Sequence, residues 1–248
     1  MLVDDNKTNR KVASTILQKA DCIIDQAADG YQAIQKVKNK PNHYDLIFMD
    51  IQMPKLDGIS AFQEIQKLGL EKVPPIIAMT AYSMKEDEER IRKAGMQDYL
   101  PKPITSDTLL RKVSQWIKPI KQNKTDESIA KEQITDPNFT DPKIILQLKE
   151  IGGEELLESI FQDFQEETAE LLDESVQALQ ANTYETIRSH MHTIKGSAGT
   201  IGLKAMSLKA EILEKQLKVN DHTNIKQQID VILKDFDYFK ENLLQLIN

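Results

Sequence analysis

Two groups of residues in this 248-residue chain have the types and spacing needed to handle a phosphoryl group. The first group follows predicted strands and comprises Asp4, Asp5, Asp50, Thr80 and Lys102. The carboxyl ends of the strands form the binding edge of an open parallel sheet. Three carboxylates that converge there repel one another, which predicts a hard divalent cation between them, most simply Mg²⁺. The lysine and the hydroxyl would then hold the oxygens of a transferring phosphoryl group.

The second group surrounds a histidine on a predicted helix. An apolar stripe at helical spacing is expected to face a core and contains Ile187, Met191, Ile194, Ala198 and Ile201. His192 is predicted to point away from this stripe, toward solvent and beside Lys195, whereas His190 borders the stripe. An exposed imidazole is a competent phosphoryl nucleophile, and Lys195 would neutralise the arriving oxygens. The two histidines diverge on a helix, which argues against a shared metal ion.

Gly196 and Gly199 lie in the same predicted helix, on the side of His192. Each glycine costs a helix about 1 kcal/mol relative to alanine, so some other interaction should offset them. Close approach of a partner or close helix packing would do so.

The elements that position the first group alternate between strand and helix up to about residue 118. Strands are predicted at Met1–Asp4, Cys22–Ala27, Leu46–Asp50, Ile76–Thr80 and Asp98–Leu100. Helices are predicted at Lys7–Ala20, Gly30–Lys40, Gly58–Leu68, Glu86–Ala94 and Ser106–Ile117. Five such units predict an α/β fold with a doubly wound, five-stranded parallel sheet. The first strand is short, so we expect the chain to be the tail of a longer protein.

The elements that position the histidine are all helical. Helices are predicted at about 184–201 and 203–218, with longer apolar periods before and after them and a short helix near 142–150 that Gly152 and Gly153 end. This pattern predicts an antiparallel four-helix bundle with a cap, over residues 138–248. Residues 119–137 are polar and bracketed by prolines, and we interpret them as a flexible linker after a first domain at 1–118.

Composition excludes several function classes. The chain is 40% hydrophobic and 29% charged and lacks the roughly 18–20 consecutive apolar residues of a membrane span, so no membrane partner is expected for this segment. A net charge of −7 without a basic cluster makes nucleic acid an unexpected partner. The single cysteine and the lack of a signal peptide predict a cytoplasmic location.

The first group resembles the signature of a response-regulator receiver domain, in Asp4-Asp5, Asp50, Thr80-Ala81 and Lys102-Pro103. The resemblance covers residues 1–118 and implies a flavodoxin-like fold. It implies that Asp50 is the phosphoacceptor and that Asp4, Asp5, Asp50 and the backbone carbonyl of Gln52 hold Mg²⁺. It also implies that Lys102 and Thr80 contact the phosphoryl group. Tyr99 would be the switch aromatic, turning inward when Thr80 moves toward the phosphate.

The second group resembles a histidine-containing phosphotransfer (HPt) domain, whose pattern His-x-x-Lys-Gly-Ser is met from His192 onward. The resemblance implies that His192 is phosphorylated and that Lys195 assists as a cation. Together the two resemblances imply a multistep phosphorelay. An upstream histidine kinase would phosphorylate Asp50, His192 would receive the group, and a downstream response regulator would accept it. The parent would be a hybrid sensor histidine kinase.

Two rival functions stay open from the sequence. The chain could be a binding module that phosphorylation of Asp50 switches, with the bundle serving only for interaction or dimerisation. It could also be a metal-dependent phosphatase, although that class expects an aspartate where Gln52 stands. The chain is not expected to be a kinase by itself, because no nucleotide-binding loop is recognisable. Its enzymatic part would be limited to receiver self-phosphorylation and autophosphatase activity.

Overall fold

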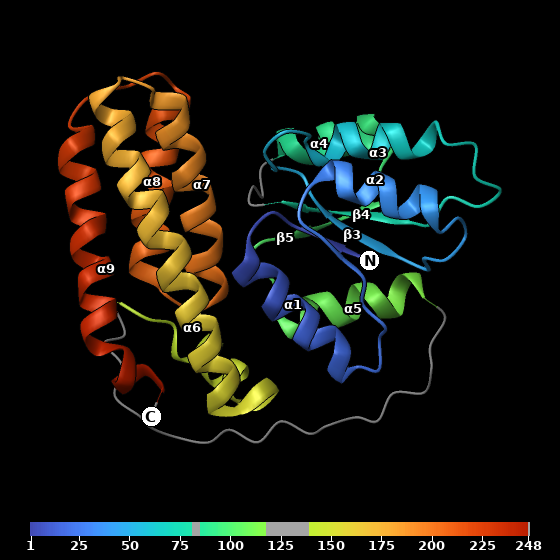
Figure 1. The fold of residues 1–248 in the computed structure, drawn as a ribbon, viewed down its shortest axis with the longest axis horizontal. Coiled ribbons are helices and arrows are strands. Elements are labelled where there is room, and N and C mark those ends of the chain that lie inside the picture. Colours follow the sequence, from blue (N-terminus) through green and yellow to red (C-terminus); the bar gives the residue numbers. More distant parts are fainter. Residues whose placement is uncertain (81–84, 118–138, 248) are drawn as a thin grey trace.

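The computed structural model describes residues 1–80, 85–117 and 139–247, and the predicted linker at 119–137 lies outside the described residues. The chain forms an α/β body followed by a helical body, and the two lie side by side (Figure 1). Both predicted fold classes are confirmed.

The sheet of the first body has five parallel strands in the order β2-β1-β3-β4-β5. Their bounds are β1 Leu2–Val3, β2 Gln26–Ala27, β3 Ile47–Asp50, β4 Ile76–Thr80 and β5 Asp98–Pro101. β3 and β4 are buried along their whole length, as expected of central strands that helices cover on both faces. The strand predicted at Cys22–Ala27 is shorter than expected, because only its last two residues pair with β1.

Five helices cover this sheet. They are α1 Lys7–Lys19, α2 Gly30–Asn39, α3 Gly58–Gln66, α4 Lys85–Ala94 and α5 Ser106–Trp116. α1 and α5 lie on one face, and α2, α3 and α4 lie on the other (Figure 1). The side chains of Asn6, Asp29 and Asp57 cap α1, α2 and α3 by accepting backbone N–H groups of the first turn, so these helices start where local sequence dictates.

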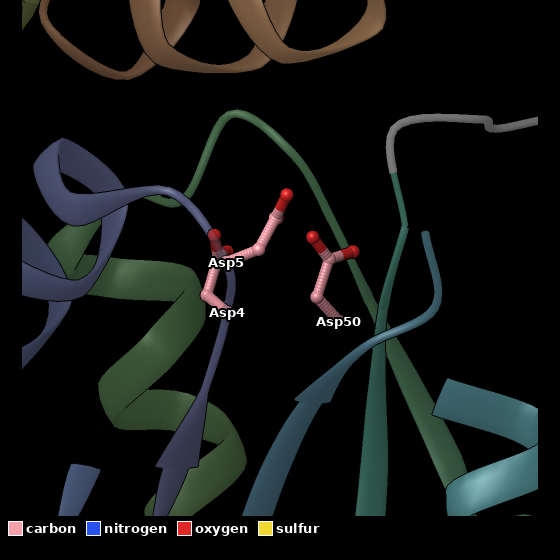
Figure 2. A group of neighbouring side chains, drawn as sticks. All are labelled: Asp4, Asp5 and Asp50. Atoms are coloured by element: carbon pink, nitrogen blue, oxygen red, sulfur yellow. The ribbon is translucent and has the colours of Figure 1, made fainter. Parts of the chain in front are cut away.

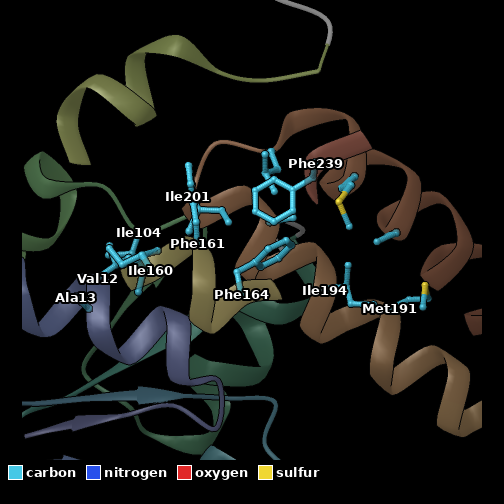
Figure 3. Close-up of a cluster of buried hydrophobic side chains, with 14 of the residues drawn as sticks. Val12, Ala13, Ile104, Ile160, Phe161, Phe164, Met191, Ile194, Ile201 and Phe239 are labelled. Atoms are coloured by element: carbon cyan, nitrogen blue, oxygen red, sulfur yellow. The ribbon is translucent and has the colours of Figure 1, made fainter. Parts of the chain in front are cut away.

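The second body is a bundle of long helices: α6 Pro142–Gln180, α7 Tyr184–Thr200, α8 Lys204–Lys218 and α9 Ile225–Ile247. Phe161, Phe164 and Phe239 fill its centre and are fully buried (Figure 3). The rings of Phe161 and Phe164 pack edge-on against that of Phe239, with centroids 5.6 and 5.4 Å away. The predicted short helix ends at the expected glycines: α6 comprises two helices that meet at a kink, where Gly153 is not helical and has a φ of 71°. Within the described residues, no helix is both long and apolar enough to cross a bilayer.

The two bodies share an apolar core where α1 meets the bundle. Val12, Ala13 and Ile104 of the first body belong to the same buried cluster as Ile160 and Phe161 of the second (Figure 3). This contact fixes the face of the sheet domain that the bundle covers, and with it the relation between the two predicted phosphoryl sites.

Candidate phosphotransfer site

The structure brings the three predicted carboxylates together at the carboxyl edge of the sheet. Asp4 and Asp5 follow β1, and Asp50 ends β3, a neighbouring strand. One oxygen from each of the three lies within 4.8 Å of the others. Figure 2 shows the three side chains above the strand ends, with a bundle helix passing over them. Asp4 and Asp50 are buried, so this cluster is an internal pocket and not an acidic surface patch.

Lys102 supplies the positive charge inside this pocket. Its Nζ lies 2.7 Å from Asp4 Oδ2 and 2.7 Å from Asp50 Oδ2. The backbone holds the lysine in place, because the Lys102 N–H donates to the Thr80 carbonyl across 2.7 Å. The ammonium group is therefore poised beside the carboxylate that the sequence predicts to carry phosphate.

The pocket still holds an excess of negative charge. Burial, together with the charge of Asp4, raises the pKa of Asp5 to about 6. Burial also raises the pKa of Asp50 to about 7, although Lys102 acts in the opposite direction. A pKa raised in this way means that ionised carboxylates are unfavourable here without another cation.

The residues present fit a magnesium ion. The clustered donors are carboxylate oxygens, the hard ligands that Mg²⁺ prefers. Gln52 contributes a further oxygen nearby: its backbone N–H donates to Asp50 Oδ1 across 3.2 Å, and its buried side-chain Oε1 has no hydrogen-bond partner in the described part of the chain. Receiver domains generally bind Mg²⁺ through such a carboxylate set.

Thr80 and Tyr99 lie on adjacent strands beside the pocket. Thr80 ends β4 and is buried, and it pairs with Pro101 of β5. Tyr99 lies in β5, half-buried against the core beneath α2, α3 and α4, with Lys112 Nζ 5.9 Å from the centre of its ring. The inward turn of Tyr99 stays a prediction.

His192 is the centre of the second site, on α7. The prediction that its side chain points into solvent is wrong for this arrangement, because the side chain is only 12% exposed. Two neighbours explain the difference: the sheet domain covers this face of α7, and Glu214 of α8 binds the ring. His192 Nδ1 lies 2.7 Å from Glu214 Oε1.

Glu214 is the residue that sequence reasoning missed. It is fully buried, and its second oxygen, Oε2, accepts a hydrogen bond from Lys195 Nζ across 2.6 Å. A signal was present in the sequence, because the buried residues of α8 include Ala210, Leu213 and Leu217, and Glu214 falls on the same face. A carboxylate among core positions requires a partner, here His192 and Lys195.

These charges determine the protonation of the site. Burial acts to raise the pKa of Glu214, but its hydrogen bonds with His192 and Lys195 outweigh that effect and hold the pKa at about 2. Burial lowers the pKa of His192, against the attraction of Glu214. The ring is therefore neutral near pH 7. An ionised carboxylate can only accept, so Nδ1 carries the proton and Nε2 is unprotonated.

The two sites face a common cavity of about 270 Å³. Asp5 and Gln52 line it from the sheet domain, and Arg188, Ser189 and His192 line it from α7. The charge of Lys102 reaches far enough across to lower the pKa of His192. Asp5 and Gln52 thus form one composite site with α7 residues that are more than 130 positions away in sequence.

The remaining residues of the histidine motif have packing roles. A Cβ at Gly199 would lie 3.1 Å from Ser207 Oγ and 3.7 Å from Pro103 Cβ, and a Cβ at Gly196 would lie 3.8 Å from Asn9 Nδ2. Close packing thus accounts for Gly199, as predicted, whereas Gly196 has room for a methyl group. His190 lies outside the cavity and joins α6 to α7 through Ser175 Oγ, 3.0 Å from its Nδ1.

Comparison with known proteins agrees with this geometry. Residues 1–114 match the response regulator receiver domain family, and residues 159–247 match the Hpt domain family. The chain is a receiver domain followed by an Hpt domain. Signal transduction histidine-protein kinase BarA of Escherichia coli (strain K12) is 30% identical over 220 residues, which cover 88% of this chain and 24% of BarA. Aerobic respiration control sensor protein ArcB of Escherichia coli O157:H7 is 30% identical over 208 residues, 82% of this chain and 26% of ArcB.

This chain spans about a quarter of the length of both relatives. A solved receiver domain of a Pseudomonas aeruginosa sensor histidine kinase, with a magnesium ion in its active-site cleft, is 38% identical and covers 48% of this chain and 95% of its own, with a TM-score of 0.44. The two matched families, receiver and Hpt, support a function in a two-component phosphorelay, in which such domains work with histidine kinases and response regulators.

Proposed function

We propose that Asp50 accepts a phosphoryl group from a histidine kinase and passes it to His192 of the same chain, which delivers it to a downstream response regulator. The observation that carries this proposal is the shared cavity, which Asp5 and Gln52 line opposite His192. We place this part of the protein in the cytoplasm, because the phosphoryl groups of a histidine kinase originate in ATP.

In the first step a carboxylate oxygen of Asp50 attacks the phosphorus of the kinase phosphohistidine. The O–P bond forms, the N–P bond breaks, and the kinase imidazole leaves. Lys102 already contacts Asp50 and neutralises the phosphoryl oxygens, and Thr80 donates its hydroxyl to one of them. Asp4, Asp5, Asp50 and the Gln52 carbonyl would hold Mg²⁺, which when bound offsets the charge of the carboxylates and the phosphoryl group.

In the second step Nε2 of His192 attacks the phosphorus on Asp50. The N–P bond forms through the lone pair of the unprotonated Nε2, the O–P bond breaks, and the Asp50 carboxylate is restored. No proton has to leave, because the Nδ1–H remains on the ring and is bound by Glu214. The positive charge that develops on the ring is stabilised by that carboxylate. In the third step a downstream aspartate takes the phosphoryl group from Nε2.

The test compares the wild type with Asp50→Asn and His192→Gln, each incubated with Mg²⁺ and acetyl phosphate as the donor. Acid and alkali stability distinguish acyl phosphate from phosphohistidine. We expect acyl phosphate alone in His192→Gln, phosphohistidine in the wild type, and neither in Asp50→Asn. A wild-type chain whose His192 is never labelled, even by a phosphorylated receiver added separately, would show that the bundle is a binding module.

A further inference from the structure

An acidic face of α6, formed by Ser159, Asp163 and Glu167, contacts the start of α1 beside the phosphoryl cavity. Asp163 binds two lysines: its Oδ1 lies 2.8 Å from Lys7 Nζ, and its Oδ2 lies 2.5 Å from Lys11 Nζ. Lys11 Nζ also donates to the Ser159 carbonyl across 3.3 Å. The Asp163 side chain is only 10% exposed, so its charge depends on these lysines.

Glu167 lies one helical turn beyond Asp163 and binds the first turn of α1. It accepts from the Asn6 side-chain amide across 2.8 Å and from the Lys7 backbone N–H across 3.3 Å. Asn6 is itself the N-cap of α1, so Glu167 completes the capping of that helix from the other domain. The carboxylate also faces the positive end of the helix dipole.

We infer that this acidic face selects the receiver domains that His192 serves. It fits a receiver whose first helix has an amide side chain at its N-cap and cations at its first and fifth residues, the positions of Asn6, Lys7 and Lys11. The inference rests on the proposed function, in which His192 has to meet both its own receiver and a downstream one.

The chain's own receiver occupies this face, so a second receiver has to displace it before it reaches His192. The chemistry of the face also determines which receivers are rejected. An acidic residue in the place of either lysine would be held against the nearly buried Asp163, which is a costly like-charge contact. The chain's own receiver, which phosphorylates His192, and the downstream receiver, which takes the phosphoryl group from it, therefore compete for the same acidic face.

The test uses full chains in pairs. The donor carries His192→Gln and is loaded on Asp50 with acetyl phosphate and Mg²⁺, and its acyl phosphate is measured before mixing. The acceptor carries Asp50→Asn, so it is labelled on His192 only by the donor. Lys7→Glu with Lys11→Glu is added to either partner. Lys38→Glu with Lys67→Glu, on α2 and at the C-cap of α3, is the matched control with the same charge change.

Lys7→Glu with Lys11→Glu reverses the charge of both lysines. In the acceptor, this reversal displaces the acceptor's own receiver from the acidic face. We therefore expect the rate of phosphoryl transfer from a donor with the original lysines to rise at least fivefold. When the donor also carries the charge reversal, the rate of transfer to the acceptor with Lys7→Glu and Lys11→Glu should fall at least tenfold. The control pair should change neither rate by more than twofold. An unchanged rate in either reversal would overturn the inference while leaving the proposed relay intact, whereas no labelling of any acceptor would contradict the relay as well.

A readout without phosphate separates docking from chemistry. Small-angle X-ray scattering of the unphosphorylated chain should give a larger radius of gyration for Lys7→Glu with Lys11→Glu than for the wild type. Adding Asp163→Lys to that variant restores opposite charges and should return the radius toward the wild-type value. If the radius of gyration is the same in the wild type and in both variants, these ion pairs do not hold the receiver domain against the bundle.

Discussion

At the scale of single residues, Glu214 determines which nitrogen of His192 reacts. Its carboxylate binds the Nδ1–H, so Nε2 is the unprotonated nitrogen of a ring that lines the cavity. Sequence reasoning could identify His192 and Lys195, because their spacing matches a known pattern. It could not pair Glu214 with them, since the contact joins two helices whose relative rotation depends on packing of the whole bundle.

Replacing Glu214 by Gln tests this role. The pKa of His192 is already below its usual value of 6.5, and Glu214 raises it, so the variant should have a still lower pKa. The loss of charge stabilisation should slow transfer from Asp50 to His192 by about tenfold to a hundredfold. Ring-proton NMR titration measures the pKa, and single-turnover labelling measures the rate.

The control is Glu211→Gln, on the same helix, where the carboxylate pairs with Lys215 at the surface. It should leave both quantities unchanged. A Glu214→Gln chain with wild-type transfer would show that Glu214 serves only to neutralise Lys195.

Asp5 gives a prediction for the metal site. The pocket combines raised carboxylate pKa values with clustered oxygens, so Asp5→Asn should weaken Mg²⁺ binding by about tenfold, by removal of one ligand charge. Calorimetric titration with MgCl₂ measures the affinity. The exposed Asp45→Asn serves as the control and should bind as the wild type does; equal affinities in both variants would exclude Asp5 as a ligand.

At the scale of elements, the sequence predicted the order and type of the helices and strands well, because hydrophobic period and capping residues act locally. The strand at Cys22–Ala27 was predicted too long, since an edge strand extends only as far as its one neighbour, and β1 offers two residues. The end of the short helix at Gly152 and Gly153 was predicted correctly. α6 kinks there because Gly153 is not helical, and its φ of 71° is open to glycine.

Gly153→Ala should therefore destabilise the bundle. A Cβ at this position would meet no atom within 4 Å, so the cost is confined to the backbone and should be about 1 kcal/mol. Urea unfolding measures it. Gly196→Ala is the informative contrast: it lies in regular helix, its Cβ would lie 3.8 Å from Asn9 Nδ2, and it should raise the free energy of unfolding by up to about 1 kcal/mol. Equal effects at the two positions would contradict this account.

At the scale of the whole molecule, the relation between the domains was the part that sequence could not predict. The residues of each site could be identified from local motifs, but the docking of α1 against α6 depends on surfaces that fold separately. The ion pairs of Lys7 and Lys11 with Asp163 make that docking dependent on salt.

Raising NaCl from about 0.05 M to about 0.5 M should slow internal transfer from Asp50 to His192 several-fold, because the Debye length falls by about threefold. Rapid-quench labelling of the acetyl-phosphate-loaded chain measures the rate. The chain with Lys7→Glu and Lys11→Glu should be slow at low salt and should not slow further as salt is added. A wild-type rate that is independent of salt would assign the docking to apolar contact alone.

The apolar core described above runs without a break from α1 and Ile104 into the bundle. Two domains that bury surface against each other lose part of their own stability when the neighbour melts. The receiver and the Hpt domain should thus unfold together on heating, in addition to exchanging a phosphoryl group. A core substitution near Ile160, in the bundle, would therefore also destabilise the receiver domain. Sequence changes tolerated in one domain thus depend on the other domain.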